Sequence, residues 1–202
     1  MEIPIQIKNY KNTRICLIIG SGSADVNGST IFIDNILGSF KNLGCDIHLI
    51  NFYKISNQIK NKSLGARNLR SRITELIFND FYNANNIKPF DLILSFLDAS
   101  VVSPDFFVDA QKITFTVNFT CNYHQFKDLH EEIAPHIGLN TYVSLPHKKK
   151  YEALGADSFW LPFAASPMVY TNNQKKVRNL SFIGTSYGIR PYYLWRLSLI
   201  HI

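Results

Sequence analysis

The sequence predicts an α/β fold built on a parallel, doubly wound sheet. Short apolar runs typical of buried strands alternate along the chain with stretches whose apolar residues recur at helical spacing. This alternation is the pattern of a parallel sheet covered by helices. The composition agrees, because 46% hydrophobic and 18% charged residues are ordinary for a globular domain. The length of 202 residues suits one good-sized domain, or one domain with a fragment of another.

The first strand is expected at Arg14–Gly20, a compact apolar run that ends in glycine. After a loop of small and polar residues, a helix is predicted by four apolar residues on one face, Ile33, Ile36, Leu37 and Phe40. Gly44 stands where glycine commonly ends a helix. The second strand is expected at Asp46–Phe52.

A basic stretch comes next, with six basic residues and no acidic one between Lys54 and Arg72. Such a run forms a solvated surface, or it attracts an anionic substrate, a membrane surface or an acidic partner, and these alternatives stay open. The stretch leads into a helix that Pro89 follows. Its apolar stripe consists of Leu69, Ile73, Leu76, Ile77 and Phe81.

The third strand is expected at Phe90–Leu97. Ser103 and Pro104 predict the start of a short helix that runs to about Ala110, because serine caps helices and proline fits the first turn. The later elements are, in chain order, a strand at 113–119, a helix at 124–134, a strand at 141–145, a helix that Pro146 opens and Gly155 closes, and a strand at 158–163.

These elements predict one Rossmann-like domain over residues 1–165 with six parallel strands. Residues 166–178 are polar and lack periodicity, which predicts a linker. A further strand at 179–184 and the start of an apolar, aromatic helix follow, and so short a segment does not bury its own apolar faces. We therefore expect residues 179–202 to begin a second domain, or to dock on the first.

The glycines of the first loop do not complete a dinucleotide-binding motif. Gly20-Ser21-Gly22 follows a strand, but Asp25 stands where the motif needs a third small residue. Asn51 stands where an acidic residue would hold the ribose, and no Walker-type lysine follows the loop.

No metal site, membrane span or nucleic-acid-binding module is predicted. The histidines at 124, 130 and 136 are spaced by six, which places them about 240° apart around a helix. The three cysteines are too widely spaced for a zinc site or a disulfide framework. No apolar run reaches the roughly 20 residues of a membrane span. Because the N-terminus lacks the apolar stretch of a signal peptide, a cytoplasmic location is expected.

Four blocks between about Pro89 and Arg196 carry a further signal. They are FDLILSFLDASVVSPDFF (90–107), TVNFTCNYHQFKDLHEEIAPHI (116–137), PHKKKYEALGADSFWLPFAASPMVY (146–170) and NLSFIGTSYGIRPYYLWRL (179–197). In these blocks the chain resembles a family of glycosyltransferase-like proteins related to spore maturation protein CgeB. The third and fourth blocks, in this order and spacing, are the more specific part of the resemblance.

The resemblance implies a GT-B fold, in which two Rossmann-like domains face each other. The N-terminal domain of such enzymes usually receives the acceptor, and the C-terminal domain usually binds the nucleotide sugar. Tyr187 and Arg190 would then face the donor phosphates. Most of a donor domain is missing from the 202 residues, so a longer parent chain or a separate donor-domain chain is expected to complete it. No cofactor is implied beyond the nucleotide sugar as a substrate.

Polar residues that follow the predicted strands are the candidate site. His124 and Asp98 are expected to be catalytic, His124 as a general base for an acceptor hydroxyl and Asp98 as a group that holds the acceptor. Asn118 and Asn122 are expected to hydrogen-bond sugar hydroxyls. The loop glycines and Ser21 are expected to line the cleft. For each residue, a purely structural role in a turn or a helix cap remains the alternative.

Two functions follow from these observations. One is the transfer of a sugar from a nucleotide sugar to an unidentified acceptor, once a donor domain completes the enzyme. The other is a non-catalytic remnant or accessory module that binds a sugar or a protein partner.

Overall fold

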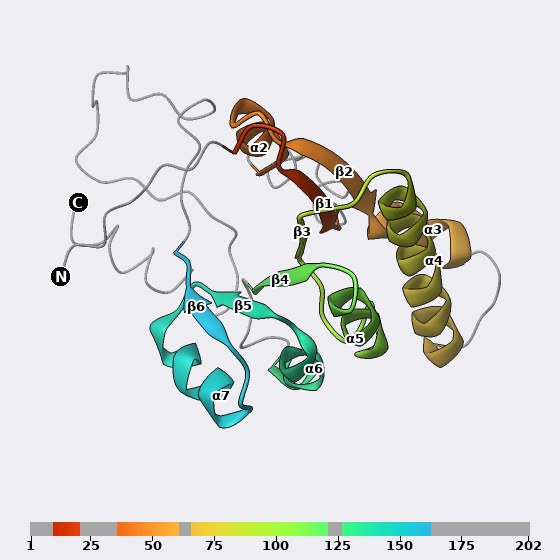
Figure 1. Cartoon of the computed structure of the whole chain (residues 1–202). Helices are drawn as coiled ribbons and strands as arrows, with labels where there is room; N and C mark the ends of the chain where they lie inside the picture. The colour runs from red at the N-terminus through yellow and green to blue at the C-terminus, as the bar shows by residue number, and fades with distance from the viewer. Residues whose placement is uncertain (1–9, 21–35, 61–65, 121–126, 163–202) are drawn as a thin grey trace, which may run out of the picture. The chain divides into compact units, whose positions relative to one another are not determined.

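The structure is a computed structural model that describes residues 10–20, 36–60, 66–120 and 127–162. These residues belong to one compact unit, Met1–Val169. They form a six-stranded sheet in the order β2-β1-β3-β4-β5-β6, and each pair of neighbouring strands is parallel (Figure 1). The strands are β1 (Arg14–Ile19), β2 (Asp46–Asn51), β3 (Leu92–Ser95), β4 (Phe115–Thr120), β5 (Leu139–Tyr142) and β6 (Ser158–Trp160). The predicted fold class is therefore confirmed.

Helices connect the strands, and α4, α5, α6 and α7 follow one another along one face of the sheet (Figure 1). The α-helices are α2 (Gly38–Asn42), α3 (Phe52–Lys60), α4 (Ala66–Ile87), α5 (Asp105–Gln111), α6 (Lys127–Ile133) and α7 (Lys148–Ala153). Two short 3-10 helices, η2 (Ala134–His136) and η3 (Leu145–His147), lie next to α6 and α7. None of the helices in the described ranges is both long and apolar enough to cross a membrane. The expected linker and second domain lie outside the described residues.

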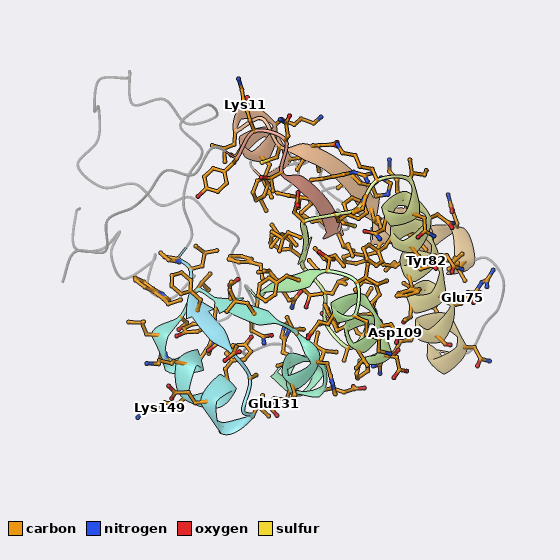
Figure 2. All side chains as sticks on the ribbon, in the orientation of Figure 1. Lys11, Glu75, Tyr82, Asp109, Glu131 and Lys149 are labelled. Carbon is orange, nitrogen blue, oxygen red and sulfur yellow. The ribbon has the colours of Figure 1, made fainter. Side chains whose placement is uncertain are left out.

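The main core lies between this helical layer and the sheet. The apolar stripe of α4 packs with α5 and with the inward residues of β1 and β3. The buried members from these elements include Cys16, Ile18, Ile73, Ile77, Phe81, Ile93, Phe106 and Phe107. A second, smaller cluster lies under α7 and consists of Ala134, Tyr142, Tyr151 and Ala156. Figure 2 shows polar or amphipathic side chains such as Glu75 and Tyr82 of α4 and Lys149 of α7 on the outer side of the helices.

The expected helix ends at two glycines are confirmed. Gly44 and Gly155 follow α2 and α7 with φ of 81° and 65°, in the left-handed region that glycine adopts without strain. The backbone N–H of Gly44 donates to the carbonyl of Lys41 at 2.9 Å and so closes the last turn.

The second strand was expected to run to Phe52, and no helix was expected in the basic stretch after it, but β2 ends at Asn51 and α3 occupies residues 52–60. The side-chain Oδ1 of Asn51 accepts hydrogen bonds from the N–H groups of Tyr53 at 3.1 Å and Lys54 at 3.4 Å. The last residue of β2 therefore caps the helix that follows it. Phe52, Ile55 and Ile59 fall at helical spacing and pack on the core.

Smaller corrections concern element ends. The helix expected to begin at Ser103 begins at Asp105, with Pro104 at its N-cap and no side-chain cap bond. The strand expected at 141–145 is β5 at 139–142. It ends where its neighbour β4 ends, because Tyr142 pairs with Thr120, the last residue of β4.

Candidate binding site at the carboxyl edge of the sheet

The strand order reverses direction at β1. The chain runs from β1 to β2 on one side, then crosses back to β3 on the other side. In open parallel sheets, ligands bind beyond the carboxyl ends of the strands at such a switch point. Here these ends belong to β1, which Gly20 follows, and β3, which is followed by the loop that carries Asp98.

Gly20 lies against the first residue of α3. A Cβ atom on Gly20 would stand 2.2 Å from Cζ of Phe52, far closer than carbon atoms approach. Glycine at this position therefore permits the close packing of the Phe52 ring. The cleft-lining role expected of Gly20 stays a prediction, and Ser21 and Gly22 lie outside the described residues.

Asp98 has one carboxylate oxygen held by its own loop. Its Oδ1 accepts hydrogen bonds from the backbone N–H of Ser100 at 2.8 Å and from the Ser100 hydroxyl. Its backbone carbonyl accepts from the N–H groups of Val101 and Val102 at 3.0 and 3.2 Å. Asp98 is half-buried, and no hydrogen bond from a described residue reaches Oδ2. The carboxylate therefore combines a fixed position with an oxygen that can accept a hydrogen bond from a ligand.

Asn118 lies beside the same loop, fully buried on β4. Its Oδ1 accepts hydrogen bonds from the backbone N–H of Leu97 at 2.9 Å and from the Ser95 hydroxyl at 2.7 Å. Its Nδ2 donates to the carbonyl of Leu97 at 3.0 Å. Asn118 and Asp98 thus both lie at the predicted edge of the sheet, and Asn118 contacts Leu97, the residue before Asp98. Hydrogen bonding of Asn118 to a sugar stays a prediction.

Two histidines that the sequence did not single out as site residues lie at the same edge. β3, β4 and β5 are adjacent and parallel, so their carboxyl ends share one side of the sheet. Asp98 follows β3, His130 lies in α6 after β4, and His147 ends η3 after β5. Both histidines are buried, with 6% and 2% of their surface exposed. From the sequence, the histidines were considered only by their spacing along one helix. The structure instead brings residues together from the segments that follow three different strands.

The electrostatics of His130 link it to both neighbours. Burial is the main cause that lowers the pKa of His130 below its ordinary value. The carboxylate of Asp98 acts in the opposite direction and raises this pKa, and His147 lowers it further. A carboxylate and an imidazole are residue types that general acid–base chemistry uses, but this imidazole is buried, which hinders proton exchange with a ligand.

A buried hydroxyl pair joins the end of β4 to α7. The Tyr151 hydroxyl donates to Oγ1 of Thr120 at 3.1 Å, and both residues are buried. Burial raises the pKa of Tyr151, while the bond to Thr120 lowers it. The Tyr151 ring stacks on Tyr142 with centroids 5.8 Å apart. This pair stabilises the position of α7, and with it the segment that carries His147.

Other expected site residues are outside the described part of the chain. They are Asn122, His124, Tyr187 and Arg190. Within the described ranges, no group of three histidine, cysteine, aspartate or glutamate side chains has the arrangement of a metal site.

The basic stretch is partly used inside the protein. Arg70 donates to Glu132 of α6 at 2.7 Å and to the carbonyl of Val102 at 3.1 Å, so it ties α4 to α6 and to the loop before α5. Arg72 pairs with Glu75 on the surface of α4, where both side chains line an open pocket of about 530 Å³ between α3 and α4. The structure thus gives these two arginines partners within the fold.

Comparisons with protein-family models, curated proteins and solved structures find no match to this chain.

The pKa shift of His130 predicts a pH dependence of stability. The folded chain holds this imidazole neutral below the pH at which the unfolded chain protonates it, near 6.5. The unfolded state therefore binds more protons as the pH falls below about 6.5, and the free energy of unfolding decreases. Urea unfolding at pH 7.5, 6.5 and 5.5 measures this loss. We expect a smaller loss in His130→Gln, and an equal loss in the two chains would contradict the assignment.

Proposed function

We propose that the chain is the acceptor-side part of a glycosyltransferase that uses a nucleotide sugar. A hydroxyl-bearing acceptor would bind at the carboxyl edge of the sheet, beside Asp98. The support is a parallel α/β fold with its switch point at this edge, together with the resemblance in sequence to the CgeB-related glycosyltransferase-like proteins. A cytoplasmic location and the absence of a nucleic-acid partner are parts of the same proposal.

The observation that carries the proposal is the carboxylate of Asp98. Oδ1 is held by Ser100, and no hydrogen bond from the described residues reaches Oδ2, which would accept a hydrogen bond from a ligand hydroxyl. In the proposed reaction, the acceptor oxygen forms a bond to the anomeric carbon of the donor sugar. The bond from that carbon to the diphosphate breaks, the nucleoside diphosphate leaves with the electron pair, and the hydroxyl proton passes to Asp98 or to the expected base His124.

Ligand binding tests this proposal directly. We expect a panel of mono- and disaccharides, titrated into the ¹⁵N-labelled chain, to shift the amide signals of Asp98 and Ser100. Asp98→Asn keeps an oxygen that accepts the Ser100 hydrogen bonds, so the loop is retained while the charge is lost. We expect this variant to bind roughly tenfold more weakly, the effect of losing about 1.4 kcal/mol of a charge-assisted hydrogen bond.

The matched control is Asp109→Asn. Asp109 pairs with Lys112 at the carboxyl end of α5, which leads into the amino end of β4 and not to the carboxyl edge of the sheet. We expect it to bind saccharides as the unchanged chain does. Equal binding by Asp98→Asn, or no response of the 98–100 amides to any saccharide, would refute the proposed acceptor site.

The 202 residues alone are not expected to turn over a nucleotide sugar. Positioning the donor over the acceptor supplies roughly 7–11 kcal/mol of the barrier lowering, and in this proposal a donor domain supplies that positioning. The check is release of nucleoside diphosphate from a panel of nucleotide sugars. Sustained turnover by the purified chain would place the donor site within it.

The alternative function is a non-catalytic module that binds a sugar or a protein partner. The burial of His130 and His147 favours it, because buried imidazoles are poorly placed to exchange protons with a ligand. Saccharide binding that is unaffected by Asp98→Asn would support this alternative over the transferase.

A further inference from the structure

We infer that Asn118 is a positioning residue, whose side-chain amide holds the backbone of Leu97 and thereby fixes the loop that carries Asp98. The inference deepens the proposed function, on which it rests for the ligand-binding role of Asp98. We call the hydrogen bonds between the Asn118 amide and the backbone of Leu97 the clamp. The evidence for the clamp itself is the hydrogen-bond geometry of the buried amide.

The backbone ladder between β3 and β4 ends just before this point. The last paired residues are Ser95 and Asn118, and the N–H of the next residue, Phe96, donates to the carbonyl of Ile18 on β1 at 3.0 Å. Leu97 is 1% exposed and lies past the end of the ladder. Its N–H and carbonyl would lack strand partners there, and buried backbone groups need them.

The Asn118 amide supplies both partners. It accepts from the N–H of Leu97 at 2.9 Å and donates to the carbonyl of Leu97 at 3.0 Å, as a neighbouring strand would. The Ser95 hydroxyl donates to the same Oδ1 at 2.7 Å and fixes the orientation of the amide. An amide carries a donor and an acceptor on two separate atoms, so an ionised carboxylate, which only accepts, would not reproduce this pattern.

The clamp acts on the residue before Asp98. With Leu97 fixed on both sides of its backbone, the turn from Asp98 to Val102 begins from a defined position. The bonds of Ser100 then hold Oδ1 of Asp98. Asn118 thus determines where the carboxylate stands, although its own side chain is fully buried.

Two measurements on the ligand-free chain test this role. The first is hydrogen exchange of the Leu97 amide, which we expect Asn118→Ala to accelerate by roughly tenfold or more through local opening. The second is the NMR titration of His130. Asp98→Asn removes the carboxylate that raises the pKa of His130, so this pKa falls, and we expect Asn118→Ala to lower it in the same direction by displacing Asp98.

The matched control is Thr116→Val. Thr116 is buried on the same face of β4, and its Oγ1 accepts a hydrogen bond from the N–H of Gly138 at 2.9 Å, a bond to the residue before β5 that does not involve the Asp98 loop. We expect it to destabilise the chain without changing the exchange of Leu97 or the titration of His130. Ser95→Ala is a milder variant that loosens the amide, for use if Asn118→Ala does not fold.

The outcomes separate the clamp from the proposed function. Faster exchange of Leu97 with a lowered pKa of His130 supports the clamp even if no saccharide binds. Unchanged exchange and titration in Asn118→Ala, or in Ser95→Ala where that variant is used, overturn it, and so does an equal response to Thr116→Val. Saccharide binding by a chain without a clamp would leave the acceptor site in place and remove only the positioning role.

Discussion

Phe81→Ala is expected to lower the free energy of unfolding by about 3–5 kcal/mol, the usual cost of removing a buried phenylalanine ring. Phe81 is fully buried on α4, in the main core. Its ring lies 5.8 Å from the Phe90 ring, stacked, and 6.0 Å from the Phe78 ring, edge to face. Alanine would leave a cavity between α4 and the sheet that rigid neighbours fill poorly. Urea unfolding followed by circular dichroism measures the loss.

The control for Phe81 is the next residue, Tyr82. It is 46% exposed on the outer side of α4 and stacks on Phe78 at 6.1 Å (Figure 2). Tyr82→Ala keeps the same helix and loses a half-exposed ring, so we expect a loss of about 1 kcal/mol or less. Similar losses from the two variants would mean that α4 does not pack on the sheet through its Phe81 face.

Tyr151→Ala is expected to cost about 3 kcal/mol or more, since it removes one of the two tyrosine rings of the second cluster. Tyr151 is fully buried, stacks on Tyr142 and donates a hydrogen bond to Thr120. Its loss would loosen α7 against β5 and β6. Thermal unfolding and the hydrogen exchange of the β6 amides both report on this region.

Tyr151→Phe separates the ring from the hydroxyl. The ring and its stacking remain, while Oγ1 of Thr120 loses its hydrogen-bond donor. We expect a loss of about 0.5–1.5 kcal/mol, the usual net value of one hydrogen bond. A loss as large as that of Tyr151→Ala would show that the hydroxyl pair, and not the packing, holds α7 in place.

The fold class followed from local patterns, and the strand order did not. After Arg14, the residues from Ile15 to Ile19 are all apolar, which identifies a strand buried on both faces. No local pattern states that β1 pairs with β2 on one side and β3 on the other, because pairing depends on contacts between distant segments. The helix α3 was not predicted, because its lysines were considered only as part of a basic stretch. The residues that indicate this helix are Asn51, which caps it, and Phe52, which packs on the core.

The strand pattern placed the candidate residues at one edge of the sheet, but it did not predict the hydrogen bonds that they make there. Residues after parallel strands meet at one edge, which placed Asp98 and Asn118 correctly near each other. Sequence cannot distinguish an asparagine that binds a ligand from one that replaces a strand partner, because both follow a strand and both are polar. His130 and His147 lie near Asp98 because β3, β4 and β5 are adjacent in the sheet, and the sequence does not show which strands are adjacent.

Neighbouring strands of the sheet differ in how far apart they lie along the sequence. Bonds across β3, β4, β5 and β6 join residues 17 to 23 positions apart, as between Ser95 and Asn118 or Asn140 and Asp157. The contact of β1 with the start of β3 joins Arg14 to Asp91, 77 positions away. Short loops close at lower entropic cost than long ones, so we expect the later strands to pair earlier in folding than β1 pairs with β3. β1 comes before the other described strands in the chain, and its pairing with β3 spans the longest separation. This pairing forms the switch point of the sheet, beside which the candidate site lies.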